Sequence, residues 1–378
     1  MRSRIEEATL MKSSSVWSKM RSADWGGFLR GVYDYNVGKH LKTLPPRALM
    51  VPITYRCNSR CVMCNIWQWE RKPELSPAQW GDILRDPLFR TIERLTFTGG
   101  EPLLRKDLLE MTDVFMEAMP SLKSFSYVTN GFLPERAEEY TRAAIQRCEA
   151  RGIGLSVSVS LDGVGELHDK IRGVPGGFEK TEETLMRMRS LRADHHFWLG
   201  ANCVVFQANL GHLDELKEWC RERDISPGFQ IIGFHDTYVS NADRQEELDF
   251  DEEGRRRLFQ FIEELARPRS VDDTSSFYWN DLLHMYRDGR ARRTPCPFMW
   301  DALALDCYGD LYHCLNVKPF GNCLTDGTCS QLYYEPDNLA RRRRMYSSVC
   351  RTCDSGCMVR VGLKKDLKRY LWFLLTRR

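Results

Sequence analysis

Three cysteines stand close together in the segment Cys57-Asn-Ser-Arg-Cys61-Val-Met-Cys64, directly after the apolar run of residues 48–54. A structural zinc site normally takes four ligands from two separated pairs. Iron–sulfur clusters are held by closely spaced cysteine thiolates, normally four of them. A loop with only three cysteines would leave one iron without a protein ligand. The spacing therefore predicts an iron–sulfur cluster with one coordination position open to another molecule.

A second segment, Thr98-Gly-Gly-Glu-Pro102, follows the next β-rich run. Together with the Cys-x3-Cys-x2-Cys spacing it resembles the radical S-adenosylmethionine (radical SAM) superfamily. The resemblance implies a [4Fe–4S] cluster on the three cysteines, with S-adenosylmethionine (SAM) bound to the open iron. SAM cleavage would then give a 5′-deoxyadenosyl radical that abstracts hydrogen. The SAM amino group is implied to bind at Thr98, Gly99, Gly100 and Glu101, where glycine lets the backbone approach a ligand closely.

The middle of the chain alternates between short β-rich runs and longer charged stretches of helical character. The predicted strands are residues 50–54, 94–98, 124–129, 153–161, 197–205 and 229–232. The predicted helices are residues 106–119, 135–151, 178–191, 212–223 and 251–265. This alternation predicts an α/β fold with a parallel sheet covered by helices. The resemblance implies a partial (β/α)6 barrel at residues 45–270.

In such a fold the active site gathers at the carboxyl ends of the strands. Thr129 and Asn130 follow the third strand, and the matching family segment borders SAM. Ser158 and Ser160 alternate along the fourth strand and so share one face with Ser156, where they would line the barrel with polar groups. The resemblance implies that Arg172 binds the SAM carboxylate, a task that suits its planar, two-pronged donor group.

Four further residues are candidates for contact with a substrate. Cys203 on the fifth strand is expected near the mouth of the barrel, and its thiol, or that of Cys323 or Cys357, could return a hydrogen atom to a substrate radical. His235, Asp236 and Tyr238 follow the sixth strand in a polar cluster. An ordinary surface loop explains that cluster equally well, so it remains an open alternative.

A second cysteine set lies nearer the carboxyl terminus. Cys296 is followed after twelve residues by Gly309 and then by Cys314, and Cys350, Cys353 and Cys357 come later. This pattern, with a hairpin expected across Tyr308-Gly309, resembles the SPASM or twitch extension of radical SAM enzymes. The resemblance implies one auxiliary [4Fe–4S] cluster on Cys296, Cys314, Cys350 and Cys353, with Cys357 competing for a place. A zinc site is the alternative.

An auxiliary cluster can accept the second electron when an alcohol carbon is oxidised to a ketone. We therefore expect a radical SAM oxidoreductase that dehydrogenates a carbohydrate-type small molecule, or an epimerase of such a substrate. Peptide maturation or crosslinking is the second interpretation. A non-catalytic iron–sulfur or zinc protein that binds a partner is the alternative from another class.

The chain of 378 residues carries 14 cysteines and a formal net charge of +3. Without an evident export signal, the cysteines are expected as metal ligands in the cytoplasm. We expect a helical extension at 1–44, an auxiliary-cluster domain at 271–360 and a basic amphipathic tail at 361–378. That tail is a candidate for peripheral contact with a membrane surface. The electron donor is expected to be of flavodoxin or ferredoxin type, and no nucleic-acid partner is expected.

Overall fold

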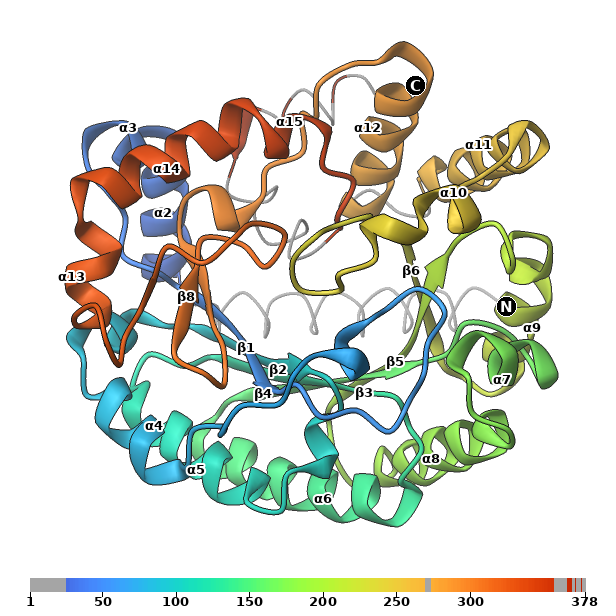
Figure 1. The fold of residues 1–378 in the computed structure, drawn as a ribbon, viewed down its shortest axis with the longest axis horizontal. Helices are drawn as coiled ribbons and strands as arrows, with labels where there is room; N and C mark the ends of the chain where they lie inside the picture. The colour runs from blue at the N-terminus through green and yellow to red at the C-terminus, as the bar shows by residue number, and fades with distance from the viewer. Residues whose placement is uncertain (1–24, 269–272, 357–365, 369–370, 372–374, 376–378) are drawn as a thin grey trace, which may run out of the picture. The chain divides into compact units, whose positions relative to one another are not determined.

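The structure, a computed structural model, describes residues 25–268, 273–356, 366–368, 371 and 375 (Figure 1). One compact unit spans Pro45–Arg360, and the described parts of Met1–Leu44 and Val361–Arg378 belong to another. Cys357, most of the expected basic tail and the first 24 residues lie outside the described residues. Expectations that rest on these segments stay predictions.

The larger unit is built on a nine-stranded sheet in the order β6-β5-β4-β3-β2-β1-β7-β8-β9. Six strands run parallel to one another. They are β1 (Ala48–Thr54), β2 (Arg94–Gly99), β3 (Ser124–Thr129), β4 (Gly154–Ser160), β5 (Trp198–Val205) and β6 (Ser226–Ile231). Each overlaps a predicted strand. Because the strand order does not close on itself, the sheet is an open one, and the predicted α/β fold with a partial barrel is confirmed.

Helices follow the strands in the chain, and α4, α5, α6 and α8 lie along one face of the sheet (Figure 1). The helices described in this unit are α4 (Pro77–Leu84), α5 (Leu108–Ala118), α6 (Pro134–Arg151), α7 (Glu166–Arg172), α8 (Gly177–Leu191), α9 (Leu213–Glu222), α10 (Gln245–Leu248), α11 (Glu252–Ala266), α12 (Thr274–Asp288), α13 (Cys329–Tyr334), α14 (Pro336–Ser347) and α15 (Val349–Thr352). Short 3-10 segments lie at Ile66–Gln68, Pro87–Thr91, Pro102–Leu104, Leu210–His212, Ala242–Arg244 and Pro297–Met299. Five of the α-helices match the predicted ones.

The beginning of α4 shows a signal that sequence reasoning missed. Ser76 and Gln79 form a capping box, in which the Ser76 hydroxyl accepts from the Gln79 backbone and the Gln79 side chain accepts from the Ser76 backbone. Pro77 occupies the first turn, where its missing N–H costs nothing. The Ser-Pro-x-Gln pattern could therefore have predicted this helix.

The two faces of the parallel sheet differ in character. On β2, β3 and β4 buried residues alternate with half-buried ones. The buried set faces the helices and is apolar, and it includes Leu95, Phe97, Phe125, Tyr127, Leu155, Val157 and Val159. The half-buried set is mostly hydroxyl-bearing: Thr96, Thr98, Ser126, Ser156, Ser158 and Ser160. Because parallel sheets are usually apolar on both faces, this polar inner face indicates a site rather than a second packing layer.

The carboxyl-terminal part of this unit continues the same sheet. Strand β7 (Ala302–Leu305) pairs in parallel with β1, with Ala302 opposite Ala48. Strands β8 (Asp310–Tyr312) and β9 (Gly321–Asn322) follow in antiparallel order. The turn between β7 and β8 contains Gly309 with a φ of 86°, a conformation that favours glycine. The expected hairpin across Tyr308-Gly309 is therefore confirmed.

In the other unit, α2 (Trp25–Tyr33) is followed by a π-helical stretch at Asp34–Gly38 and by α3 (Lys39–Leu41). Tyr35 and Leu44 are buried there. Among the described residues, no helix has the length and apolar composition needed to cross a membrane.

Candidate functional site

The cysteine loop after β1 is held in place by backbone bonds from several elements. The end of α7 accepts two of its amides, from Arg60 to the Arg172 carbonyl and from Val62 to the Ile171 carbonyl, both at 2.9 Å. The Ser59 hydroxyl donates to the same Arg172 carbonyl at 2.9 Å. On the other side, the Asn241 amide group donates to the Met63 carbonyl at 3.0 Å. The loop conformation is therefore fixed by the fold.

The three thiols of this loop lie close enough to influence one another. The pKa of Cys57 is raised to about 11 and that of Cys64 to about 12, mainly because both thiols are buried. The neighbouring Cys61 adds to both shifts. Cys61 is buried, and its sulfur lies 2.9 Å from the Ser59 hydroxyl. The raised pKa values keep the thiols of Cys57 and Cys64 protonated at neutral pH, so binding of a metal must displace their protons.

Gly99 and Gly100 allow the end of β2 to lie against the loop. A Cβ on Gly99 would come within 2.2 Å of the Thr54 carbonyl oxygen, and one on Gly100 within 2.1 Å of the Arg56 carbonyl oxygen. Gly99 also has a φ of +128°, which L side chains rarely adopt. The amide that follows, Glu101 N, donates to the Arg56 carbonyl at 2.7 Å. The two glycines are therefore needed for direct contact between this segment and the cysteine loop.

Glu101, Thr129 and Asn130 form one buried group. The Glu101 carboxylate accepts from the Thr129 hydroxyl at 2.9 Å, from the Asn130 amide at 2.6 Å and from the Leu103 amide at 3.0 Å. Burial raises the pKa of Glu101 to about 7, against the effect of these bonds. The Asn130 side chain donates to Asn58 in the cysteine loop at 2.7 Å. In this structure the Glu101 carboxylate thus joins the end of β2 to the end of β3.

Arg172 ends α7 beside the cysteine loop. Its Nε lies 2.6 Å from Asp162 Oδ2, and its Nη1 lies 3.6 Å from the Cys61 sulfur. Burial opposes its charge, but the Asp162 carboxylate outweighs burial and raises the pKa of Arg172. Asp162 is fully buried and also accepts from the Val204 amide of β5 at 2.8 Å. Sequence reasoning named Arg172 but missed Asp162, although the carboxylate directly follows the serine-rich strand.

Ser158 and Ser160 lie on the polar inner face of the sheet, as expected. In the register of β4 and β5, Ser158 is opposite Gly200 and Ser160 is opposite Asn202. Asn202 is exposed, whereas its neighbour Cys203 is buried. The alternation of side chains along a strand therefore assigns Asn202 and the serines to the same face.

The expectation that Cys203 points toward the mouth of the barrel is wrong. Cys203 is 2% exposed and belongs to the apolar core on the helix-facing side, where the Asn209 amide group lies 3.5 Å from its sulfur. The physical reason is the two-residue period of the strand, which turns residue 203 away from the face that carries residue 202.

Of the three candidates after β6, Tyr238 reaches the Thr98-Gly99 segment at the end of β2. Its hydroxyl donates to the Gly99 carbonyl at 3.1 Å and lies 3.1 Å from the Thr98 hydroxyl. Burial raises its pKa, and the Cys64 and Cys57 thiols contribute to the shift. His235 is half-buried near Gly233 of its own loop, and Asp236 is exposed. Tyr238 therefore belongs with the predicted SAM segment, whereas the contacts of the other two are with their own loop or solvent.

The second cysteine set comes together in the structure. Cys296, Cys314, Cys350 and Cys353 line one pocket, although they come from three separate segments of the chain. Apolar side chains complete the lining, among them Phe298, Met299, Val317, Met345 and Val349. The position of Cys357 lies outside the described residues. The four cysteines that the sequence grouped as ligands of one cluster are therefore neighbours in space.

Arg292 lines the same pocket and was missed from the sequence. Its Nη1 donates to the Cys353 carbonyl at 2.9 Å, and its Nε donates to the Thr294 carbonyl at 3.0 Å. Its Nη2 is buried without a hydrogen-bond partner among the described residues. A buried cation with an unused donor beside four thiols suits an anionic ligand, and an iron–sulfur cluster held by four thiolates is one.

Both cysteine sites were compared with what an iron–sulfur cluster requires. Among the residues that the structure describes, no three His, Cys, Asp or Glu side chains are arranged to hold a single metal ion. A [4Fe–4S] cluster makes a different demand, because each cysteine binds a different iron, so the sulfurs need not converge on one point. The donor sets, three and four cysteine sulfurs, are those that such clusters take, and the residues present fit the group.

The chain was then compared with known proteins. Residues 51–220 match the family model described as the Radical SAM superfamily. The chain is 30% identical over 181 residues to the PqqA peptide cyclase of Rhizobium meliloti (strain 1021), which is 47% of this chain and 44% of that protein. It is 24% identical over 294 residues to the AdoMet-dependent heme synthase of Nitratidesulfovibrio vulgaris, covering 71% of this chain and 72% of that one. For the first four curated relatives, the match spans 35–62% of their own length.

Solved structures with the same fold include Streptococcus suis SuiB bound to S-adenosylmethionine, with a TM-score of 0.55, 16% identity, and coverage of 94% of this chain and 85% of that one. SuiB bound to the precursor peptide SuiA gives a TM-score of 0.51 at 15% identity over 88% and 75% of the two chains. The structure of anSMEcpe with AdoMet and the Cp18Cys peptide gives 0.55 at 16% identity over 88% and 98%. By their match to the family model, residues 51–220, which contain the cysteine loop, form a Radical SAM superfamily domain, and the cofactors of that superfamily are a [4Fe–4S] cluster and SAM.

Proposed function

We propose that this protein is a radical SAM enzyme that abstracts hydrogen from a C–H bond of a peptide substrate. The observation that carries the proposal is the convergence of the Cys57, Cys61 and Cys64 thiols, the Gly99-Gly100 segment and Arg172 at the carboxyl ends of the parallel strands. When bound, the cluster and SAM supply a 5′-deoxyadenosyl radical. The chain supplies the position, the electrostatics and the exclusion of side reactions.

The roles of the surrounding residues follow from their contacts. Thr98, Ser158 and Ser160 present hydroxyl groups on the inner face for the polar parts of SAM. Arg172 places a positive charge beside the cysteine loop, where it would attract the SAM carboxylate. Glu101 acts through its neighbours, because its carboxylate fixes the positions of Thr129 and Asn130.

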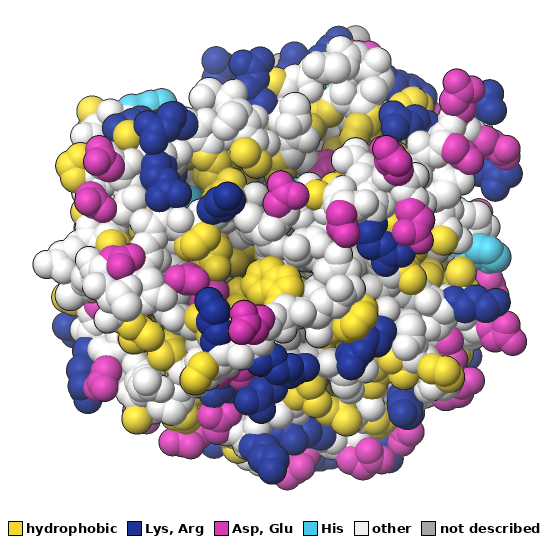
Figure 2. All heavy atoms as spheres, in the orientation of Figure 1, with side chains coloured by type: hydrophobic (Ala, Val, Ile, Leu, Met, Phe, Trp, Pro, Cys, Tyr) yellow, Lys and Arg dark blue, Asp and Glu magenta, His cyan; other side chains and the backbone are white. Residues whose placement is uncertain are grey.

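The substrate class is the point at which the proposal departs from our expectation from sequence. That expectation put a carbohydrate-type small molecule first and a peptide second. The similarity to a peptide cyclase and to structures solved with bound peptides supports the peptide instead. Hydrophobic side chains gather near the centre of the face shown in Figure 2, bordered by basic and acidic groups. Such a mixed surface suits a peptide better than a sugar, which offers mainly hydroxyl groups.

We also propose that Cys296, Cys314, Cys350 and Cys353 hold one auxiliary [4Fe–4S] cluster, with Arg292 as its buried counter-charge. A cluster there would accept the electron left over when a substrate radical becomes an oxidised product. The reducing electron for SAM cleavage would come from a flavodoxin or ferredoxin-type protein.

The enzyme proposal is tested by finding which substrate supplies the hydrogen atom that 5′-deoxyadenosine gains. Reduced, reconstituted protein is incubated with SAM and a synthetic peptide library made from deuterated amino acids, and in parallel with deuterated monosaccharides and cyclitols. Deuterium in the recovered 5′-deoxyadenosine from the peptide set alone supports the proposal. Deuterium from the sugar set alone would restore the carbohydrate interpretation. No 5′-deoxyadenosine in either set would favour a non-catalytic iron–sulfur protein.

The auxiliary cluster is tested by iron and sulfide analysis with Mössbauer spectroscopy. The sample is a variant with Cys57, Cys61 and Cys64 replaced by Ala, compared with wild type. Retention of about four irons per chain, the content of one [4Fe–4S] cluster, supports the second site. Loss of all iron, or bound zinc in its place, would contradict it.

A further inference from the structure

Two tyrosines occupy the same position relative to the two cysteine sites. Tyr55 stands two residues before Cys57, and Tyr312 stands two residues before Cys314. Both hydroxyl groups donate to the same atom, Asp306 Oδ2, each at 2.9 Å. One carboxylate oxygen therefore connects the backbone that leads into the first cysteine site with the backbone that leads into the second.

The carboxylate that makes this connection is rigidly held. Asp306 is 1% exposed, and its other oxygen accepts from the Tyr308 amide at 2.9 Å and from the Asp310 amide at 3.0 Å. These bonds belong to the turn between β7 and β8. Tyr55 and Tyr312 are themselves 4% and 8% exposed. Tyr55, Asp306 and Tyr312 are thus all buried in one fixed arrangement. Hydrogen bonds between buried groups are stronger than hydrogen bonds in water.

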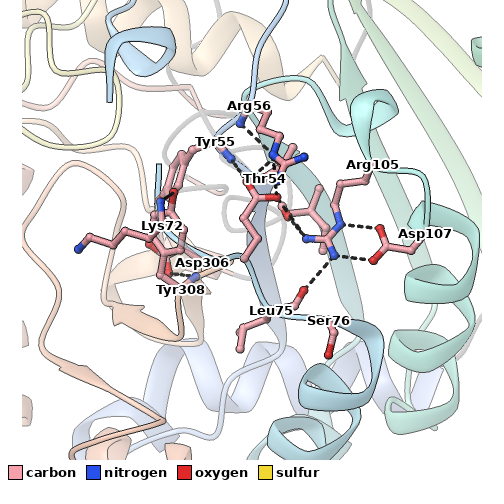
Figure 3. A network of polar contacts seen from close by, with 12 residues as sticks. Thr54, Tyr55, Arg56, Lys72, Leu75, Ser76, Arg105, Asp107, Asp306 and Tyr308 are labelled. Carbon is pink, nitrogen blue, oxygen red and sulfur yellow. Dashed lines mark hydrogen bonds and ion pairs between the residues drawn. The ribbon is translucent and has the colours of Figure 1, made fainter. Parts of the chain in front are cut away.

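The position of Tyr55 is fixed from the opposite side (Figure 3). Glu74 accepts from the Tyr55 amide at 3.1 Å and from the Thr54 hydroxyl at 2.6 Å. Glu74 is paired in turn with Arg105 at 3.6 Å, and Arg105 Nη1 donates to the Ile53 carbonyl at 3.0 Å. The end of β1 is therefore locked in the orientation that turns the Tyr55 ring toward Asp306.

Aromatic packing fills the space around this connection. The Tyr55 ring lies 5.3 Å from the Tyr308 ring and 6.4 Å from the Tyr238 ring, between centroids. Tyr238 packs against one apolar cluster that contains Tyr55 and against another that contains Tyr312 and Leu315. The preceding residue, Thr237, donates to the Leu315 carbonyl at 2.8 Å, next to Cys314. Tyr238 therefore packs near both of the tyrosines that donate to Asp306.

We propose that Tyr55, Asp306 and Tyr312 form a bridge that conducts single electrons between the two cysteine sites. In each transfer one iron–sulfur site loses an electron and the other gains it, and both tyrosines stay neutral, so no proton leaves the bridge. A continuous path of covalent and hydrogen bonds couples two redox centres better than a path with jumps through space. The inference depends on the proposed function, because it requires both sites to hold clusters.

The bridge is tested with Tyr55→Phe and Tyr312→Phe, which keep each ring and remove one hydrogen bond. Tyr140→Phe is the matched control, because Tyr140 is also buried and bonded to one side chain, Thr112 at 2.8 Å, but lies on α6. Each anaerobic protein, loaded with iron and sulfide but without SAM or peptide, is mixed with less than one electron equivalent of reductant. Freeze-quench electron paramagnetic resonance then follows the redistribution of spin between the two sites.

We expect each bridge variant to slow the redistribution of spin roughly tenfold, and the control to match wild type. Tenfold is the lower end of the loss in affinity or activity that follows removal of a residue supporting a metal ligand. Unchanged rates in both bridge variants would overturn the bridge, as would a wild-type protein with only one cluster. Equal slowing in the control would also overturn it. Iron content and melting temperature, measured on the same samples, separate a conducting role from a purely structural one.

The bridge and the proposed function are tested by independent measurements, so one can fail without the other. Spin redistribution is measured without SAM, whereas SAM cleavage is measured as 5′-deoxyadenosine. A protein with bridge-dependent redistribution that never cleaves SAM supports the bridge and contradicts the enzyme proposal. A protein that cleaves SAM, but in which neither Tyr55→Phe nor Tyr312→Phe slows the redistribution of spin, contradicts the bridge and supports the enzyme proposal.

Discussion

Arg172 at the end of α7 and Asp162 after β4 form a buried ion pair, with 2.6 Å between Nε and Oδ2. The same carboxylate accepts from the β5 backbone, and the same guanidinium reaches the Cys61 sulfur. The carbonyl of Arg172 also accepts two bonds from the cysteine loop. One pair of side chains therefore ties the carboxyl ends of two strands to the loop that would hold the cluster.

Asp162→Asn is expected to destabilise the protein by about 3–5 kcal/mol, because it leaves the Arg172 charge buried without its partner. Urea denaturation of the cluster-free protein measures the effect. Glu253→Gln breaks the exposed pair with Arg257 and serves as the control, where little change is expected. Equal effects of the two substitutions would show that the buried pair has no special role.

A second prediction concerns pH. The Glu101 carboxyl loses its proton near 4.5 in the unfolded chain, but burial raises its pKa to about 7 in the folded protein. Between these values the folded state holds more protons than the unfolded state, so stability falls as pH rises and levels off above 7. The contribution of this one group amounts to roughly 3 kcal/mol.

Stability of the cluster-free protein, measured by urea denaturation from pH 4.5 to 8, tests this contribution. Glu101→Gln cannot ionise, so the variant should lose that part of the pH dependence, although it is less stable overall because the amide cannot accept all three hydrogen bonds. A pH profile parallel to that of wild type would contradict the raised pKa.

Much of this fold could be predicted because its strands and helices are locally encoded. The β-rich runs and the charged stretches between them predicted the strands β1 to β6 and five helices. The alternation in Ser156-Val-Ser158-Val-Ser160 placed the serines on one face, and the spacing around Gly309 gave the hairpin. Each of these features depends on neighbouring residues alone, so a single sequence contains the information.

The parts that could not be predicted depend on register and on distant pairing. Cys203 was assigned to the wrong face because the ends of a strand do not show whether its odd-numbered or its even-numbered residues face inward. Asp162 and Arg292 were missed because a single charged residue in a sequence has no visible partner. The Asp306 contact with Tyr55 joins residues 251 positions apart, which no local pattern encodes.

Gly100→Ala is expected to displace the cysteine loop from β2. The added methyl group would lie 2.1 Å from the Arg56 carbonyl oxygen, and its other nearest neighbours are also backbone atoms, of Arg56 and Tyr55, which cannot move aside as a flexible side chain can. The cost should be about 1–3 kcal/mol, with loss of iron from the site at Cys57, Cys61 and Cys64. Iron analysis and urea denaturation measure the two effects. Gly154→Ala is the control, because its Cβ would meet no heavy atom closer than 3.7 Å. Full iron loading of Gly100→Ala would contradict the prediction.

The last prediction concerns the pocket of the four cysteines. In a background without Cys57, Cys61 and Cys64, Arg292→Gln should weaken iron retention by roughly 10- to 100-fold. The substitution removes a cation that lines the pocket and two bonds that shape it, to the Cys353 and Thr294 carbonyls. The rate of iron release to a chelator measures retention. Arg351→Gln, at an exposed position between Cys350 and Cys353, is the control for surface charge. If the two variants released iron at the same rate, the role of Arg292 would be that of any nearby charge. If Arg292→Gln alone released it faster, the guanidinium of Arg292 is part of the site that holds the iron.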